Sequence, residues 1–273
     1  MSSFNTAFGF VVDLLMAPFG RPWLALGGAA VATAVLMLLI VRWTSRAAAT
    51  RRAKDRMTAR VLELVLFRHD ARVSFTALGR ILAANLGYLR ILLVPLALGL
   101  FPCVLILAHL ACWFAWRPLA IGESAVVEAR LQDGFPVAER AVELSAAGHV
   151  QVETPGVRKR SPAEVAWRVR AIREGADGIT IRVAGEPPVR KQLVVSGALH
   201  KVTPRRTGPG FWPALWFPGE PPLERAGSLV EVIVHYPARQ LFVGQMEVDW
   251  IVAFVVLTVV CGLALKRPLG VQL

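Results

Sequence analysis

The sequence contains few cysteines, the residues with which secreted domains form disulfides and many metal sites bind zinc. Only three of its 273 residues are cysteines, Cys103, Cys112 and Cys261, and all three lie inside apolar runs. This placement excludes a disulfide framework and the closely spaced cysteine pairs of a zinc site. Cys103 and Cys112 would face opposite sides of a helix, so we expect packing roles for them.

Catalytic motifs are lacking as well. The sequence contains no P-loop, no nucleophile elbow and no pair of histidines at metal-binding spacing. His149, His200 and His235 are far apart and fall in or beside expected strands, which is typical of core or surface histidines. We therefore expect no enzyme activity, no metal and no cofactor.

Acidic residues are scarce in one region, residues 42–90. It holds eleven arginines and lysines against three acids, a net charge of +8 out of the formal +12 of the chain. Two runs free of formal charge flank it, Trp23–Val41 and Ile91–Trp116. Each is long enough to cross a hydrocarbon core of about 30 Å as a helix. Because a basic loop between two spans is retained on the cytoplasmic side, the pattern predicts a membrane protein with this region inside the cell.

The complete layout predicts a multi-pass α-helical membrane protein with three transmembrane helices, a cytoplasmic helical hairpin and an inserted all-β, sandwich-like soluble domain. It places the protein in the inner (plasma) membrane, with the amino terminus outside and the carboxyl terminus in the cytoplasm. The expected segments are an interfacial amphipathic helix at 1–20, a first span at 21–43, a basic coiled-coil-like hairpin at 44–90, a second span at 91–117, the extracytoplasmic β-domain at 118–247, a third span at 248–266 and a cytoplasmic tail at 267–273.

One ionisable residue, His109, lies inside the second span. Such residues are functional candidates by default, because placing them in hydrocarbon is costly. A neutral histidine near the end of a span can also bond to a neighbouring helix or reach the interface. The sequence leaves both readings open.

Residues 118–247 are typical of a β-domain, with short alternating stretches separated by turn signals such as Asp133-Gly134 and Asp177-Gly178. Six or seven such stretches predict a β-sandwich with an immunoglobulin-like layout, but no cysteine staple or tyrosine corner supports a true immunoglobulin domain. The expected strands are Ala125–Leu131, His149–Glu153, Val165–Ile172, Ile179–Val183, Val189–Val195 and Leu229–His235.

Residues Gly208–Pro222, here called the aromatic loop, read GPGFWPALWFPGEPP. Its aromatic residues are too many for an ordinary solvated loop; they are Phe211, Trp212, Trp216 and Phe217. Three readings are open: the loop enters the lipid head-group layer, binds a partner, or folds back to close the end of the sandwich.

The order of an amphipathic helix, an apolar span, a basic hairpin and a proline-bearing second span resembles the Oxa1/YidC superfamily of membrane-protein insertases. In particular it looks like the three-span branch that includes the DUF106, EMC3 and TMCO1 proteins. The segments that carry the resemblance are Val12–Phe19, Arg51–Phe67 and Tyr88–Pro95, within a region of about Phe4–Arg117 plus Trp250–Arg267. Two features differ. Trp23–Val41 lacks the positive charge that YidC-type insertases carry, and the β-domain stands where the three-span relatives have a short loop.

The resemblance implies an insertase or chaperone that assists the insertion or folding of hydrophobic client segments through a cytoplasm-open groove, without covalent catalysis. Its implied partners are the lipid bilayer, nascent or unfolded membrane-protein clients, and the ribosome. Client contacts would fall on Arg42, Arg80, Asn85, Tyr88 and Arg90, for which plain positive-inside anchoring is the alternative. Contacts with the ribosome or with anionic lipid would fall on Arg51, Arg52, Lys54, Arg56 and Arg60.

A second function is consistent with the same sequence. In it the chain is a membrane-anchored binding or scaffold protein whose extracytoplasmic β-domain recognises an envelope partner, and the aromatic loop is the recognition surface.

Overall fold

The computed structural model describes residues 2–16, 18–44, 97–146, 148–224 and 227–270, together with Leu86, Leu89 and Leu93. The chain forms two compact units, one made of Met1–Ala29 and Leu105–Phe254, the other of Ala30–Val104 and Val255–Leu273. The expected hairpin at 44–90 lies outside the described residues except for Thr44, Leu86 and Leu89.

Two helices begin the chain. Helix α1 (Ser2–Met16) ends just before Pro18, and helix α2 (Pro22–Thr44) begins with a proline at its first position, where the missing N–H costs nothing. The bend expected between them is confirmed. Its Phe19 ring packs against α2, because a Cβ added to Gly28 would lie 3.1 Å from that ring.

Among the described residues, two helices are long and apolar enough to cross a membrane, α2 and the helix Ala97–Phe114. The third expected span, 248–266, is a shorter apolar helix, α6 (Trp250–Leu265), of 16 residues. It cannot begin earlier because Val248 belongs to a strand and Asp249 caps the helix. The Asp249 carboxylate accepts hydrogen bonds from the backbone N–H groups of Ile251 at 2.8 Å and Val252 at 3.4 Å.

The β-domain contains a larger antiparallel sheet with the strand order β3-β5-β1-β9-β8, and β4 also pairs with β5. The two long strands, β1 and β5, pair over seven residues, from Ser124 opposite Arg170 to Arg130 opposite Glu164. The strands are β1 (Ser124–Leu131), β3 (Val150–Val152), β4 (Val157–Lys159), β5 (Glu164–Ala171), β8 (Arg205–Thr207) and β9 (Leu229–Val234).

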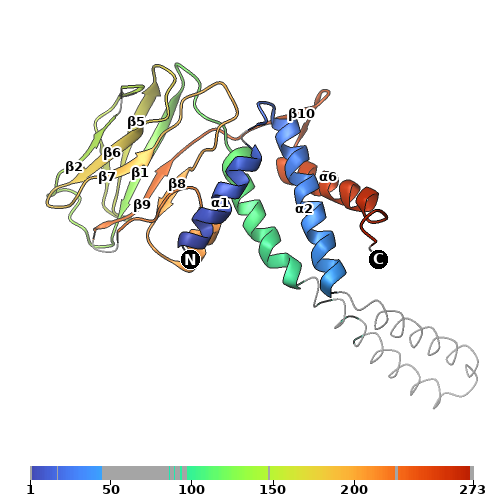
Figure 1. Ribbon diagram of the computed structural model, residues 1–273. Helices are drawn as coiled ribbons and strands as arrows, with labels where there is room; N and C mark the ends of the chain where they lie inside the picture. The colour runs from blue at the N-terminus through green and yellow to red at the C-terminus, as the bar shows by residue number, and fades with distance from the viewer. Residues whose placement is uncertain are drawn as a thin grey trace, which may run out of the picture. The chain divides into compact units, whose positions relative to one another are not determined.

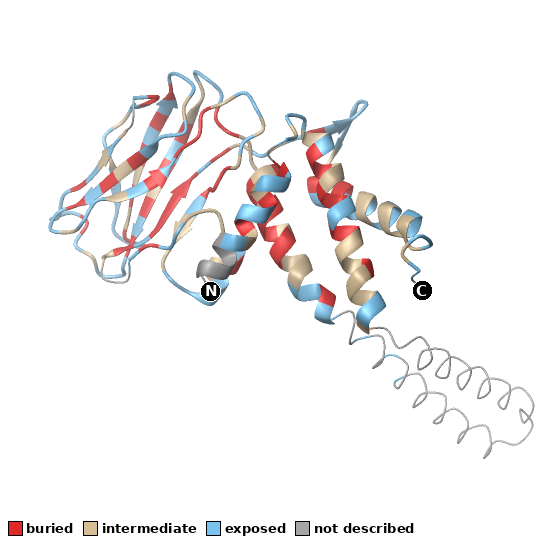
Figure 2. Cartoon of the chain, viewed as in Figure 1, coloured by how far each residue is buried: buried red, intermediate tan, exposed pale blue. Residues whose placement is uncertain are grey.

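A second sheet, in the order β2-β6-β7, faces the first (Figure 1) and consists of β2 (Val142–Ser145), β6 (Gly178–Val183) and β7 (Val189–Gln192). Alternate residues of both sheets point into one shared core, among them Val127, Trp167, Ile181 and Val232. The alternation is visible along β1 and β5 in Figure 2. The expected sandwich is confirmed, as are all six expected strands with ends shifted by one to three residues.

Several elements of the domain were not expected as such, among them the short strands β2 and β4. The aromatic loop contains a short helix, α5 (Phe211–Trp216), and a hairpin of β10 (Leu241–Val243) and β11 (Met246–Val248) precedes α6. The hairpin is joined to the start of α2, since the Trp23 indole N–H donates to the Phe242 carbonyl at 3.2 Å. The strand β8 was also missed, because its residues, Arg205–Thr207, do not alternate.

The end of the helix Ala97–Phe114 is built into the domain. The Cys112 carbonyl accepts a hydrogen bond from the Val202 N–H at 2.7 Å, and the Ala115 carbonyl accepts one from the Arg239 N–H at 3.1 Å. Leu110 and Phe114 are almost fully buried, and Phe114 stacks on Trp250 with ring centroids 6.4 Å apart. The last turns of this helix are therefore part of the domain core.

Candidate site between the first helix and the aromatic loop

The aromatic loop is fastened to the sandwich by a buried ion pair. Lys191 of β7 is completely buried, and its Nζ donates to Glu220 Oε1 at 2.6 Å and to the Thr203 carbonyl at 2.5 Å. Burial lowers the pKa of Lys191, and the neighbouring Glu220 carboxylate opposes that shift. Because a buried cation needs an anion close by, Glu220 fixes the end of the loop against the domain.

The loop also approaches the Thr203 side chain closely. A Cβ on Gly219 would overlap the Thr203 hydroxyl oxygen and lie 3.0 Å from Thr203 Cβ, so only glycine fits here. Leu215 of α5 and Leu223 just beyond the loop are buried. Of the three readings of this segment, the one in which the loop folds back onto the sandwich is confirmed.

Folding back does not bury the aromatic rings. Phe211 is 47% exposed, Trp212 65% and Trp216 54%. Phe211 and Trp212 meet edge to face with centroids 5.3 Å apart, and Phe217 lies under the Arg205 guanidinium at 5.5 Å. The loop thus turns an acid inward and presents three large rings outward, an arrangement typical of surfaces that meet lipid or another protein.

Helix α1 supplies the facing wall, and its only charged residue is turned inward. Asp13 accepts hydrogen bonds from Lys201 Nζ at 2.8 Å and from the Trp113 indole N–H at 3.2 Å. Val12 and Met16 are buried on the same side. Other side chains of α1 are uncharged and exposed: Phe10, Val11 and Leu14 are each more than half exposed.

His109 lies beneath α1. It is buried, its Nδ1 lies 2.9 Å from the Leu105 carbonyl of its own helix, and the Phe8 ring meets it edge to face at 5.0 Å. A Cβ on Gly9 would lie 3.4 Å from its Nε2, so α1 crosses directly over the imidazole. This geometry favours the structural reading of His109, a packed histidine that bonds within its own helix.

Between α1 and the aromatic loop lies a cavity of about 820 Å³. Its walls include Phe10 and Asp13 from α1, Lys201, and Phe211, Phe217 and Glu220 from the loop. The volume is within the range of about 300–1,000 Å³ that small-molecule sites occupy. The cavity has mostly apolar walls and a few charged groups, which is the composition of a binding site for an amphiphilic molecule.

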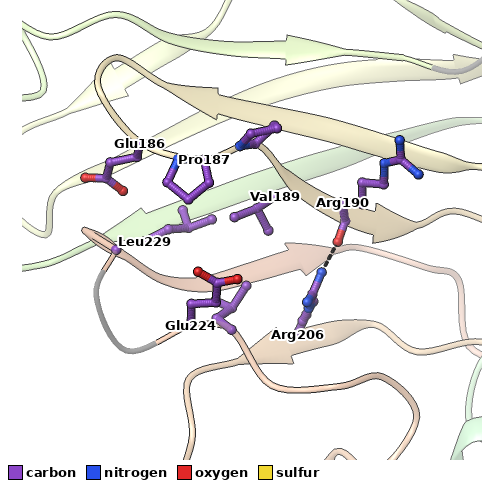
Figure 3. Close-up of a pocket in the computed structure, with 10 residues that line it drawn as sticks. Glu186, Pro187, Val189, Arg190, Arg206, Glu224 and Leu229 are labelled. Atoms are coloured by element: carbon purple, nitrogen blue, oxygen red, sulfur yellow. Dashed lines mark hydrogen bonds between the residues drawn. The ribbon is translucent and has the colours of Figure 1, made fainter.

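A smaller cavity, of about 290 Å³, lies where the turn between β6 and β7 meets β8 and β9 (Figure 3). Its polar groups hold the backbone in place. Glu186 accepts a hydrogen bond from the Ser228 N–H at 2.9 Å, and Arg206 donates to the carbonyls of Arg190 and Pro221.

Most of the predicted client-binding residues lie outside the described residues: Arg80, Asn85, Tyr88 and Arg90, and with them Arg51, Arg52, Lys54, Arg56 and Arg60. Their roles stay predictions. Arg42 is described; it is exposed and its guanidinium donates to the Leu269 carbonyl at 3.2 Å. Arg42 therefore contacts the turn that follows α6, and this turn includes Lys266 and Arg267.

Two of the β-domain histidines, His149 and His235, contact different partners. His149 is buried against the Leu193 carbonyl at 3.0 Å, whereas His235 pairs with Glu128 at 3.1 Å. Within the described ranges, no group of three or more His, Cys, Asp or Glu side chains could hold a metal ion.

Sequence reasoning missed the two ion pairs that build this site. Lys191 stands between Val189 and Leu193 at an inward position of an alternating stretch, and a charge at such a position signals a buried partner. Asp13 is the single charge on an otherwise apolar helix. The partners Glu220 and Lys201 are 29 and 188 residues away and carry no local signal.

Comparison with known proteins adds no family to this picture: no family model, curated protein or solved structure matches the chain.

Proposed function

We propose that the chain is a membrane-protein insertase or chaperone of the Oxa1/YidC type, which helps hydrophobic client segments enter the bilayer. In this proposal α2, the helix Ala97–Phe114 and α6 enclose the client path, and the basic region 44–90 receives the client on the cytoplasmic side. The protein lowers the cost of moving unpaired polar groups through hydrocarbon and forms no covalent bond with its client.

The observation that carries this proposal is the length of α6. Its 16 residues correspond to about 24 Å, against about 30 Å of hydrocarbon. Both ends are fixed by charge, because Asp249 caps the start and Lys266 and Arg267 follow the end. A short helix with fixed ends thins the bilayer around it, and a thinner bilayer shortens the apolar path that a client's polar flank must cross.

The exposed surface of α6 supports a lipid-facing position. Large apolar side chains are exposed on one broad face along its length, and the other residues of the helix are apolar as well; the exposed ones are Ile251, Val252, Val255, Val256, Val259, Val260 and Leu263. A helix that is apolar all round and exposed needs lipid or other helices around it.

The length of α6 can be tested directly. Inserting four leucines after Val256 adds about 6 Å and one full turn, which restores the match with the bilayer. We expect client insertion into vesicles to fall several-fold while the variant itself still inserts. The same four-residue insertion in α2, which already has 23 residues, is the control and should leave insertion nearly unchanged. Equal activity of both variants with the native chain would refute the role of thinning.

The basic region is tested by charge removal. Replacing Arg42 and Arg90 together with glutamine should reduce client insertion if these residues receive the client. Replacing Arg158 and Arg160, two exposed arginines of the β-domain, with glutamine removes the same amount of charge away from the expected client path and is the control. Unchanged insertion with unchanged topology would remove Arg42 and Arg90 from the mechanism.

The aromatic loop favours a second candidate, a membrane-anchored protein that recognises an envelope partner. Trp212 and Trp216 are exposed on a loop that Glu220 holds rigidly, as a recognition surface requires. Deleting Leu119–Glu247 separates the two functions. Insertion survives in part if the helices carry the activity, and all function is lost if the β-domain carries it.

A further inference from the structure

We propose that the cavity between α1 and the aromatic loop binds one membrane phospholipid with a zwitterionic head group. The hydrocarbon chain lies against the ring and proline walls, and the head group meets the charged pair Asp13–Lys201. This site is separate from the client path and does not depend on insertase activity.

The walls favour hydrocarbon over a peptide. Beside the rings of Phe10, Phe211 and Phe217, the cavity is lined by Pro209, Pro218, Pro221 and Pro222 of the loop. Proline has no backbone N–H, so this stretch cannot form the ladder of hydrogen bonds by which an extended peptide adds to a protein edge. An acyl chain needs no such donors and is stabilised by the removal of its apolar surface from water.

The charges favour a head group that carries both signs. Lys201 and Asp13 line the cavity as a pair at 2.8 Å, and Glu220 lines it while paired with the buried Lys191 at 2.6 Å. The two acids and two lysines sum to no net charge. A phosphate beside Lys201 and an ammonium beside Asp13 would extend this alternation, whereas an anionic head group would leave Asp13 or Glu220 facing a like charge.

The cavity lies close along the chain to a helix that could cross a membrane. Helix α1 forms one wall, and only the five residues 17–21 separate it from α2, a helix long and apolar enough to cross a bilayer. Five extended residues reach about 17 Å, so the cavity cannot lie far from the start of α2. Trp212 and Trp216 are exposed next to a wall of the cavity. Tryptophan is one of the residue types enriched at the membrane–water interface.

The test uses the full chain extracted in a mild detergent from vesicles that contain phosphatidylethanolamine and phosphatidylglycerol in equal amounts. Native mass spectrometry then counts the phospholipids retained by each chain. We expect one phosphatidylethanolamine per native chain, enriched at least five-fold over phosphatidylglycerol. The variant Ala214→Phe places a ring in the cavity, because Ala214 lines it, and should reduce retention at least ten-fold.

The control variant is Ala198→Phe, which adds the same ring at an exposed position outside the cavity lining; it should retain lipid as the native chain does. Circular dichroism checks whether both variants are folded. If Ala214→Phe does not fold, the lipid retained by the native chain alone tests the proposal. No retained phospholipid, equal retention by both variants, or a preference for phosphatidylglycerol would each overturn the proposal. Loss of retained lipid with normal client insertion would leave the insertase proposal untouched.

Discussion

Lys191 Nζ lies 2.6 Å from Glu220 Oε1 in a place where neither group is more than one-tenth exposed. The pair connects the inner face of β7 to the aromatic loop, so a loop rich in proline and aromatic residues is held by the core of the sandwich.

Glu220→Gln should destabilise the domain strongly. The substitution leaves the Lys191 ammonium buried without an anion, and removing one partner of a buried pair costs about 3–5 kcal/mol. Replacing both residues, Lys191→Met with Glu220→Leu, should recover most of that loss because no charge stays buried. Denaturant unfolding of the full chain in detergent, followed by circular dichroism, measures both effects. Glu139→Gln, at an exposed position, is the control; a loss no larger than the control's would contradict the interpretation of the pair.

Stability should fall above about pH 10 through Tyr236. Its buried hydroxyl accepts a hydrogen bond from the Val194 N–H at 3.0 Å, and burial raises the pKa of Tyr236 above its ordinary value. The unfolded chain releases this proton near its ordinary pKa of about 10, whereas the folded chain keeps it. The folded state therefore binds more protons above pH 10, and the free energy of unfolding decreases as pH rises.

The lowered pKa of Lys191 acts in the opposite direction below that range, since there the unfolded chain binds more protons than the folded one. Comparing the native chain with Tyr236→Phe at each pH cancels the contribution of Lys191. The difference in unfolding free energy between the two should shrink from about pH 9 to about pH 11. Parallel curves for the two chains would show that Tyr236 titrates normally.

Gly219→Ala should displace the aromatic loop. The added Cβ overlaps the Thr203 hydroxyl, and overpacking of this kind costs about 1–3 kcal/mol. Because Glu220 is the next residue, the ion pair with Lys191 should lengthen as well. Hydrogen exchange of the loop amides should rise in the variant, and adding Thr203→Gly should reverse the rise. At Gly197 a Cβ would meet nothing closer than 4.0 Å, so Gly197→Ala should leave exchange in the loop unchanged.

Helix α1 should be released when its charge is removed. Asp13→Ala eliminates the bonds from Lys201 and Trp113, and we expect a loss of about 1 kcal/mol because the pair is only partly buried. Asp13→Lys alone should remove the protection of the α1 amides from hydrogen exchange. The double variant Asp13→Lys with Lys201→Asp, which exchanges the two charges, should restore part of that protection. Hydrogen exchange of residues 2–16 measures this. Equal exchange in the single and double variants would mean that the two charges do not interact.

The sandwich could be predicted because its signal is local. In β5, Val165, Trp167 and Val169 alternate with polar residues, and the structure buries those three while pairing the strand with β1. The turn before α2 could be predicted as well, since Pro18, Gly20 and Pro22 favour a bend over a continuous helix. Such patterns depend on neighbours within ten residues, which a sequence displays directly.

The candidate site could be predicted only in part. The rings of the aromatic loop were visible as a cluster, but the inward turn of Glu220 depends on Lys191 and Thr203, which belong to other segments. The short helix α5 was missed because its six residues include Pro213 and offer no helical period.

The hydrogen bond from Trp23 to Phe242 joins residues 219 positions apart in the chain. During synthesis α2 leaves the ribosome long before the β10–β11 hairpin exists, so its indole N–H stays without this acceptor until nearly all of the polypeptide has been made. The contact between α2 and the β10–β11 hairpin therefore forms only after the strands of the sandwich have been synthesised: α2 is made early, but it acquires this hydrogen-bond acceptor late.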